Sequence, residues 1–263
     1  MKTLSQSRCR FAPSAPGLNG ERDRRRSRLF AIMPLMFACF CLAAGADFYT
    51  AKFERTYTPQ GTAHLTISNM NGSVSVTAWN KKTITVRANA DASIPIQDQV
   101  RGDDITVAVK RSLSLGRSDF EAFVPAETSV SIKNLRGDIE LRGVDGHLSV
   151  DSFDSEVRLL DIRGPSADVK ITSGNIIFDG DLLEGGSYNF QSVRGDIDVS
   201  VPAATSFNLV TRAMSENINL GDFLSSMTGL NRGDKGISGT HLKGGARLSL
   251  TTYNGRILLH RKR

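Results

Sequence analysis

Short runs of alternating apolar and polar residues recur along most of the chain. In residues 129–146 the apolar positions are Val130, Ile132, Leu135, Ile139, Leu141 and Val144. The same spacing of apolar positions returns in four other segments, where the place of Val130 is taken by Leu65, Leu148, Tyr188 and Leu248. Alternation with a period of two predicts β-strands that bury one face, and no segment from residue 47 onward shows a sustained helical period.

A small residue holds the same place in each repeat, between two apolar pairs. Ser155 takes this place in one copy, and glycine takes it in four others: Gly72, Gly137, Gly195 and Gly255. Glycine adopts the positive φ of a tight turn without a steric penalty. We therefore interpret the four glycines as structural repeat turns that join two short strands. Two further copies, in 169–178 and 207–220, fit with small insertions.

Strand units of about 18–21 residues predict an all-β fold with one of two architectures. In a single-domain β-solenoid, which is parallel β-helix-like, each repeat forms one coil and equivalent residues lie above one another. In an antiparallel β-sandwich, the alternative, the strands need only alternate. The constant phase of four apolar positions favours the solenoid and assigns these residues to its inward face: Leu135, Phe153, Val193 and Tyr253.

Residues 1–46 differ from the rest of the chain and predict a signal peptide. A basic cluster at 24–28 precedes an uninterrupted apolar run, 29–44, and small residues follow up to Ala46. These are the parts of a secretory signal, and the run is shorter than the roughly 20 residues of a spanning helix. An uncleaved anchor is the alternative. We expect a signal peptide (1–46), a β-solenoid domain (47–263) without a membrane span after cleavage, and export to the periplasm, cell surface or exterior.

The net positive charge and the cysteines of the chain all lie in this leader. The chain has 33 basic and 27 acidic residues, a net charge of +6. Eight basic and two acidic residues lie in 1–46, so 25 of each remain in 47–263. A neutral mature domain argues against a nucleic-acid partner. All three cysteines (Cys9, Cys39, Cys41) are in the leader, which excludes disulfides and cysteine chemistry from the mature domain.

Residues 221–245 break the repeat and are rich in glycine and serine, so we expect a long loop there. One of four Arg-Gly-Asp tripeptides lies in it, and its residues form the candidate interaction loop: Arg232, Gly233 and Asp234. Two other copies fall on the repeat turns at Gly137 and Gly195. There, glycine and aspartate serve the turn itself.

No catalytic, metal or cofactor motif is present. We expect His64 and His147 to point outward and His241 to lie in the predicted loop, and none has a second histidine at metal-ligand spacing. A carbohydrate-active β-helix enzyme remains the alternative function, with outward carboxylates as its candidates: Asp138, Glu140, Asp196 and Asp198. A calcium site is a weaker hypothesis and would use Asp179, Asp181 and Glu184. We expect no enzyme activity and no cofactor.

Four segments resemble the bacterial "putative-adhesin" domain family of extracytoplasmic β-repeat proteins: TAHLTISNMNGSVSVTAW, VPAETSVSIKNLRGDIELRGVDG, SVRGDIDVSVP and GGARLSLTTYNGRILLH. The resemblance covers about residues 53–260. It implies a β-helical, secreted or envelope-bound protein with an adhesive or scaffolding role, and it supplies no catalytic residue. We therefore expect a non-catalytic interaction module whose partner is an envelope or extracellular protein or a glycan.

Overall fold

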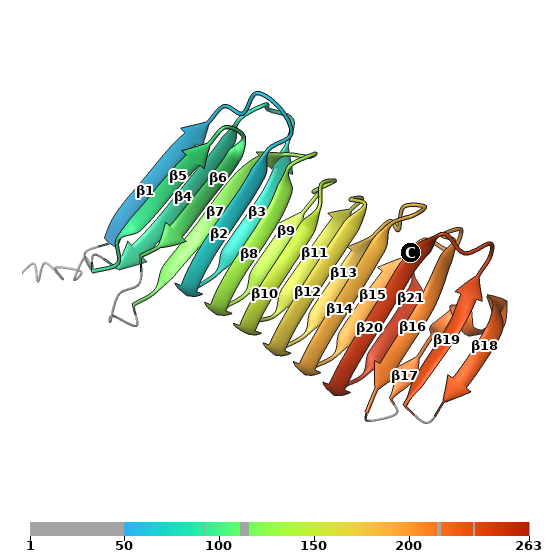
Figure 1. The fold of residues 1–263 in the computed structure, drawn as a ribbon. Coiled ribbons are helices and arrows are strands. Elements are labelled where there is room, and N and C mark those ends of the chain that lie inside the picture. Colours follow the sequence, from blue (N-terminus) through green and yellow to red (C-terminus); the bar gives the residue numbers. More distant parts are fainter. Residues whose placement is uncertain (1–49, 92, 111–115, 215–216, 234, 263) are drawn as a thin grey trace, which may run out of the picture. The chain divides into compact units, whose positions relative to one another are not determined.

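The computed structural model describes residues 50–91, 93–110, 116–214, 217–233 and 235–262, and the expected signal peptide lies outside them. The described residues form two sheets (Figure 1). In spatial order, sheet A contains β1 (Thr50–Tyr57), β4 (Ile84–Asp91), β7 (Ser118–Pro125), β3 (Val74–Trp79), β9 (Ile139–Arg142), β11 (Val157–Ile162), β13 (Ile176–Gly180), β15 (Ile197–Val201), β21 (Ile257–Arg261) and β17 (Ile218–Asn219). Sheet B contains β18 (Met227–Gly233), β19 (Gly236–His241), β16 (Phe207–Ala213), β20 (Ala246–Asn254), β14 (Ser187–Arg194), β12 (Ser166–Ser173), β10 (Leu148–Asp154), β8 (Ser129–Arg136), β2 (His64–Asn71), β6 (Asp104–Val109) and β5 (Ile96–Arg101).

The central strands stack as parallel coils, which confirms the predicted β-solenoid. In sheet B, Val130 of β8 lies beside Leu148 of β10, which lies beside Ala167 of β12, and Ala167 lies beside Tyr188 of β14. The same coils pair in parallel in sheet A, from β9 through β15. Among the described strands, antiparallel pairs occur only toward the two ends, such as β1–β4 and β18–β19. The antiparallel sandwich is therefore not the architecture.

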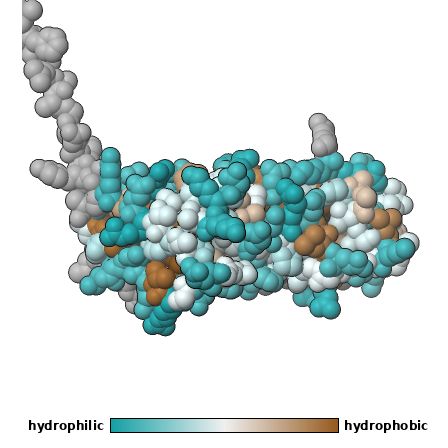
Figure 2. Space-filling model, turned by 90° about the horizontal axis from the view of Figure 1, so that it is seen from above, coloured by the Kyte–Doolittle hydropathy of each residue, from teal (hydrophilic) through white to brown (hydrophobic). Residues whose placement is uncertain are grey.

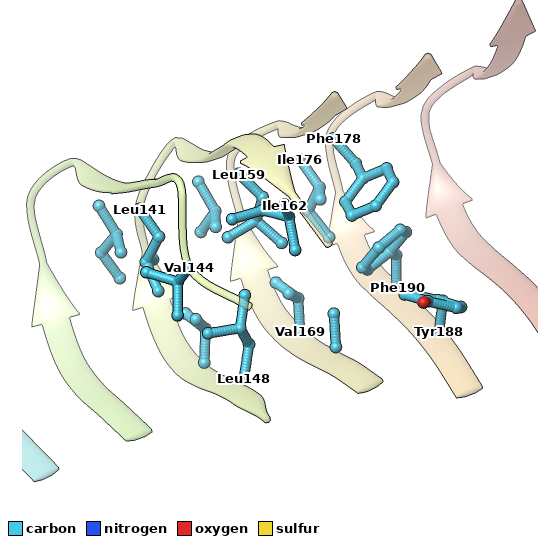
Figure 3. Close-up of a cluster of buried hydrophobic side chains, with 14 of the residues drawn as sticks. Leu141, Val144, Leu148, Leu159, Ile162, Val169, Ile176, Phe178, Tyr188 and Phe190 are labelled. Atoms are coloured by element: carbon cyan, nitrogen blue, oxygen red, sulfur yellow. The ribbon is translucent and has the colours of Figure 1, made fainter. Parts of the chain in front are cut away.

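Apolar side chains from both sheets fill the space between them (Figure 3). Leu141 and Leu159 point inward from sheet A, and Val169 and Phe190 point inward from sheet B. The rings of Phe178 and Phe190 pack with their centroids 5.2 Å apart. Burial of one side chain of this size contributes roughly 1.5–3 kcal/mol to the free energy of unfolding, so the stacked core can stabilise the domain without disulfides.

The four apolar positions expected to continue the inward face are instead exposed, and this part of the prediction is wrong. Leu135 is 48% exposed, whereas Ile132 is fully buried. The two positions differ by three, so in a regular strand they point to opposite faces. The inward place belongs to Asn134, whose amide donates to the carbonyl oxygens of Gly137 (2.9 Å) and Gly72 (3.2 Å). The same parity exposes Phe153, Val193 and Tyr253.

The repeat turns stack so closely that they leave no room for a side chain. Gly137 has φ +117°, and a Cβ on it would lie 2.3 Å from the carbonyl oxygen of Gly72. At Gly255, a Cβ would lie 2.0 Å from the carbonyl oxygen of Gly195. These contacts show why glycine recurs at the same position of each repeat. It permits the positive φ of the turn, and its lack of a side chain lets one coil pack closely against the next.

The segment 221–245 is not the long loop expected from its composition. It contains a 3₁₀ helix (Gly221–Ser226) and the hairpin of β18 and β19. Most side chains of β18 are exposed, because this strand lies at the edge of sheet B. An edge strand with few core contacts has no need of regular apolar alternation, and its glycines and polar residues therefore resemble a loop in sequence.

His241 closes this end of the core and is buried, contrary to its expected place in a loop. Its ring lies between Phe207 and Phe223, with centroid distances of 5.1 and 5.0 Å. Its Nδ1 atom lies 2.7 Å from the carbonyl oxygen of Thr205. The three rings form a cap over the last coil.

The order of coils in space differs from their order in the chain. The last two strands, β20 and β21, insert between β14–β15 on one side and β16–β17 on the other. The repeat at 207–220 is therefore the outermost coil. Within the described residues, no helix is long and apolar enough to cross a membrane.

Candidate interaction surface

The outer face of sheet B presents side chains in straight columns, because neighbouring parallel strands are in register. One column has short polar side chains on six strands and ends in Val210 on β16: Thr66, Ser131, Ser149, Asp168, Asn189, Ser249 and Val210. The next is longer and partly charged: Ser68, Lys133, Asp151, Lys170, Gln191, Thr251 and Arg212. A rigid sheet thus displays repeated chemistry at about 4.8 Å intervals.

A third column, at the edge where these strands end, is apolar. We call it the apolar ladder, and it consists of Met70, Leu135, Phe153, Val193, Tyr253 and Met214. The six side chains are 37–52% exposed, and Thr172 occupies the same position on β12. In Figure 1 the arrowheads of β2, β8, β10, β12, β14 and β20 form a row along one border of the sheet, and the ladder follows this row.

Charged side chains border the apolar ladder on both sides. The cations are Lys133, Lys170 and Arg212 in the preceding column and Arg136 and Arg194 at the corner, and the anions are Asp151 and Asp154. With Asp168, the ion-pair partner of Lys170, added, the described residues of the border carry five positive and three negative charges. Two of the cations are partnered by carboxylates, Arg136 by Asp154 (3.6 Å) and Lys170 by Asp168 (2.6 Å).

A groove of about 500 Å³ adjoins the end of the ladder. Arg212 and Tyr253 line it from β16 and β20, Met214 lines it from just after β16, and the β18–β19 hairpin of the same sheet lines its other side. That side includes Gly233 of the candidate interaction loop together with Lys235. The described residues that line the groove include two cations and no carboxylate. The groove suits a ligand with an anionic group and an apolar or planar part.

Residues 56–260 match the Toastrack family, DUF4097. The chain belongs to this family. The matched range agrees with the 53–260 expected from the sequence, and the expected family resemblance is confirmed. No curated protein matches the chain.

Among solved structures, the Toastrack chain is similar to a putative cell adhesion protein from Clostridium sporogenes, with 13% identity and a TM-score of 0.47. The similarity covers 81% of this chain and all of that one. A putative adhesin from Bacteroides fragilis is similar at 11% identity with a TM-score of 0.37, over 81% of this chain and 97% of the other.

The Arg-Gly-Asp tripeptides of this Toastrack domain lie in three kinds of place. At the turn of Gly195, the carboxylate of Asp196 accepts hydrogen bonds from Arg256 Nε (3.0 Å) and Nη2 (2.6 Å). The Gly102 copy forms the tip of the β5–β6 hairpin. In the candidate loop, Arg232 and Gly233 belong to β18, and Asp234 lies outside the described residues.

The outward histidines lie together at the other border of sheet B. His64 and His147 are exposed, as expected, and line a hollow of about 390 Å³ with Ser129 and Ser166. The Nδ1 atom of His147 lies 2.7 Å from the Ser166 hydroxyl oxygen. Sequence reasoning missed Ser166. The signal that could have found it is the register of β10 on β12, which sets Leu148 beside Ala167 and therefore His147 beside Ser166.

The carboxylates of the alternative enzyme belong to two coils that are not adjacent, with Asp138 and Glu140 at β9 and Asp196 and Asp198 at β15. Glu140 and Asp198 lie on β9 and β15, three strand spacings apart, which is about 14 Å. That separation exceeds the roughly 5–9.5 Å between the two carboxyl groups of glycosidases. Asp196 lies closer to Asp198 along β15, but the paired Arg256 guanidinium holds the pKa of Asp196 below its ordinary value. A general acid needs the opposite shift.

The calcium hypothesis also finds no support in the side chains that were proposed for it. Asp179 pairs with Lys262 Nζ at 2.6 Å, so an ammonium group occupies the place that a cation would take. In the part of the chain that the structure describes, no cluster of three or more histidine, cysteine or acidic residues could hold a metal ion.

Proposed function

We propose that this Toastrack protein is a non-catalytic, adhesin-like interaction module of the bacterial envelope. The observation that carries the proposal is the outer face of sheet B, where three columns of side chains are held in register on a rigid scaffold. Such a face suits contact with an extended polymer or a flat protein surface, because each strand repeats the same group at a fixed spacing. The partner is an envelope or extracellular protein or a glycan.

A binding screen combined with a turnover assay tests this function against the enzyme alternative. The exported protein is applied to a glycan array and to envelope extracts, and reducing-sugar release is measured on every glycan that binds. The proposal expects binding without turnover. Turnover that Asp138→Asn or Asp196→Asn abolishes would establish the carbohydrate-active enzyme instead.

Matched substitutions locate the contact. Ser131→Arg and Ser149→Arg place bulk on the outer face of sheet B, and Thr77→Arg places it on the outer face of sheet A. Binding should fall for the first two and persist for the third. Arg232→Ala separately tests the candidate interaction loop, and this substitution should weaken binding.

Export is part of the same proposal. Cleavage of residues 1–46 would release a domain that begins at Asp47. Mass spectrometry of the protein recovered from the envelope should give this N-terminus. Recovery of the full chain in the membrane fraction would support the uncleaved anchor instead.

A further inference from the structure

The apolar ladder is too regular to be a set of chance exposures. Single apolar residues scattered over a hydrophilic surface, as in the view of Figure 2, are ordinary. The ladder instead follows seven adjacent strands, from β2 to β16, so its ends lie about 29 Å apart. An exposed apolar row of this length, with polar groups on both sides, marks a contact surface.

The charges beside the ladder indicate what it contacts. With Asp168, the ion-pair partner of Lys170, included, five cations and three carboxylates of the described residues border it, a net charge of +2, although residues 47–263 are neutral as a whole. Arg194 and Arg212 have no ion-pair partner among the described residues. The adjoining groove adds Lys235 and no described carboxylate. The positive charge is therefore local to the ladder, and the complementary partner is anionic.

We propose that the apolar ladder and its basic border dock onto an anionic lipid bilayer. The ladder side chains would enter the boundary between headgroups and acyl chains, and Arg194, Arg212 and Lys235 would contact headgroup phosphates. An apolar row bordered by basic residues is the arrangement by which amphipathic elements bind anionic membranes. The inference goes beyond the proposed function and does not depend on it, because a protein or glycan partner could be bound without any affinity for lipid.

Two other occupants fit the same surface less well. A second copy of the chain, related by a two-fold axis, would bring the same basic border against itself and leave the net charges unpaired. A glycan could stack on Phe153 and Tyr253, but the other four ladder side chains, Met70, Leu135, Val193 and Met214, offer it neither hydrogen bonds nor a ring.

Vesicle co-sedimentation tests the proposal. The exported protein is mixed with vesicles of phosphatidylglycerol and phosphatidylethanolamine, and separately with vesicles of phosphatidylcholine alone. We expect binding to the anionic vesicles that weakens with salt, and little binding to the neutral ones. No binding to anionic vesicles, or equal binding to both kinds, would overturn the inference.

Matched variants assign the contact. Leu135→Ser with Phe153→Ser should lower partitioning at least about tenfold, and Arg194→Gln about fivefold, since each juxtamembrane cation contributes about 1 kcal/mol. Leu183→Ser is the control, because Leu183 is similarly exposed (42%) but precedes β14, at the opposite border of sheet B. Equal losses in the control and the ladder variant would contradict the assignment.

Two further readouts keep the variants interpretable. Every variant carries the same N-terminus, and its thermal midpoint is measured first, so that unfolding cannot pass for lost binding. Sedimentation velocity then determines the oligomeric state. A wild-type dimer that dissociates on Leu135→Ser would show that a second copy covers the ladder, and would overturn the membrane proposal. Partitioning of Arg194→Gln equal to that of the wild type in low salt would equally contradict the role of the basic border.

Discussion

At the repeat turn, single atoms decide whether two coils can stack. The glycine of one turn approaches the backbone carbonyl of the next so closely that a methyl group cannot fit. Asn134 then satisfies two of those carbonyl oxygens from inside the core. Three residues before other turns, Ser192 and Thr252 do the same with one hydroxyl bond each, to Gly174 (3.1 Å) and Gly195 (2.9 Å). These buried side-chain donors are thus paired with carbonyl oxygens of the turns, as their burial requires.

Replacement of Gly137 by alanine should be far more costly than the same change at an open turn. The new Cβ would lie 2.3 Å from the Gly72 oxygen, and the residue would be held at φ +117°. We expect Gly137→Ala to lower the free energy of unfolding by about 3 kcal/mol. Gly102→Ala, with φ +61° and open space around it, should cost about 1 kcal/mol. Equal costs in chemical denaturation would contradict the close stacking of the turns.

The Asp196–Arg256 pair should make a pH-dependent contribution to stability. Arg256 lowers the pKa of Asp196 in the folded state, so the carboxylate stabilises the fold above the ordinary aspartate value of 3.8. This contribution disappears as the pH falls through the lowered folded pKa. Asp196→Asn should therefore reduce the thermal midpoint at neutral pH and match the wild type in strong acid. A difference that persists unchanged in acid would contradict this cause.

Among the elements, the strands of the repeat copies were predictable, including β2–β3, β16 and β20–β21, and the β18–β19 hairpin was not. Apolar residues with a period of two, together with the constant phase of the turn glycines, predict strands β8 through β15 and their stacking. Strict alternation with Ile132 places the Leu135 side chain on the outer face, but a comparison of repeats hides this, because five other copies also carry an apolar residue there. The β18–β19 hairpin lies at a sheet edge and buries few side chains, so its sequence lacks a regular apolar alternation. The groove is lined by this hairpin, so the pattern of apolar and polar residues could not predict the groove either.

The cap formed by His241, Phe207 and Phe223 should hold the β18–β19 hairpin against the last coil. His241→Ala would leave a cavity between two aromatic rings and remove the contact with the Thr205 carbonyl. A local loss of about 2–3 kcal/mol is expected. Hydrogen exchange should quicken in β18 and β19 and stay unchanged in β8–β14. Uniform acceleration would show that the cap is not a separate unit.

In the whole molecule, the last strands of the chain complete the stack of coils. The last residues, in β20 and β21, form the coil that joins the outermost coil to the rest. Strand β16 pairs with β20 and β19, and β19 pairs with β16 and β18, so β20 alone connects these strands to β14. The stack of coils can therefore be completed only after β20 and β21 are available.

A chain that ends at Gly245 tests this dependence. Without β20 and β21, the side chains of Leu248, Leu250 and Ile257 leave the core and β16 loses its parallel neighbour. We expect limited proteolysis to cut the shortened chain throughout 205–245 while 129–201 stays protected. Equal protection of both regions would mean that β16 can dock onto β14 directly.

The central claim is that the solenoid buries one set of apolar residues and displays the other as a ladder. Thermal unfolding of two variants, Ile132→Ser and Leu135→Ser, tests it most directly, because the repeat pattern treats the two positions alike and the structure separates them. Ile132→Ser, at a fully buried position, should lower the free energy of unfolding by more than about 3 kcal/mol. Leu135→Ser, at a half-exposed position, should lower it by less than about 1 kcal/mol. Equal losses would show that both side chains face the core, and the ladder would not exist.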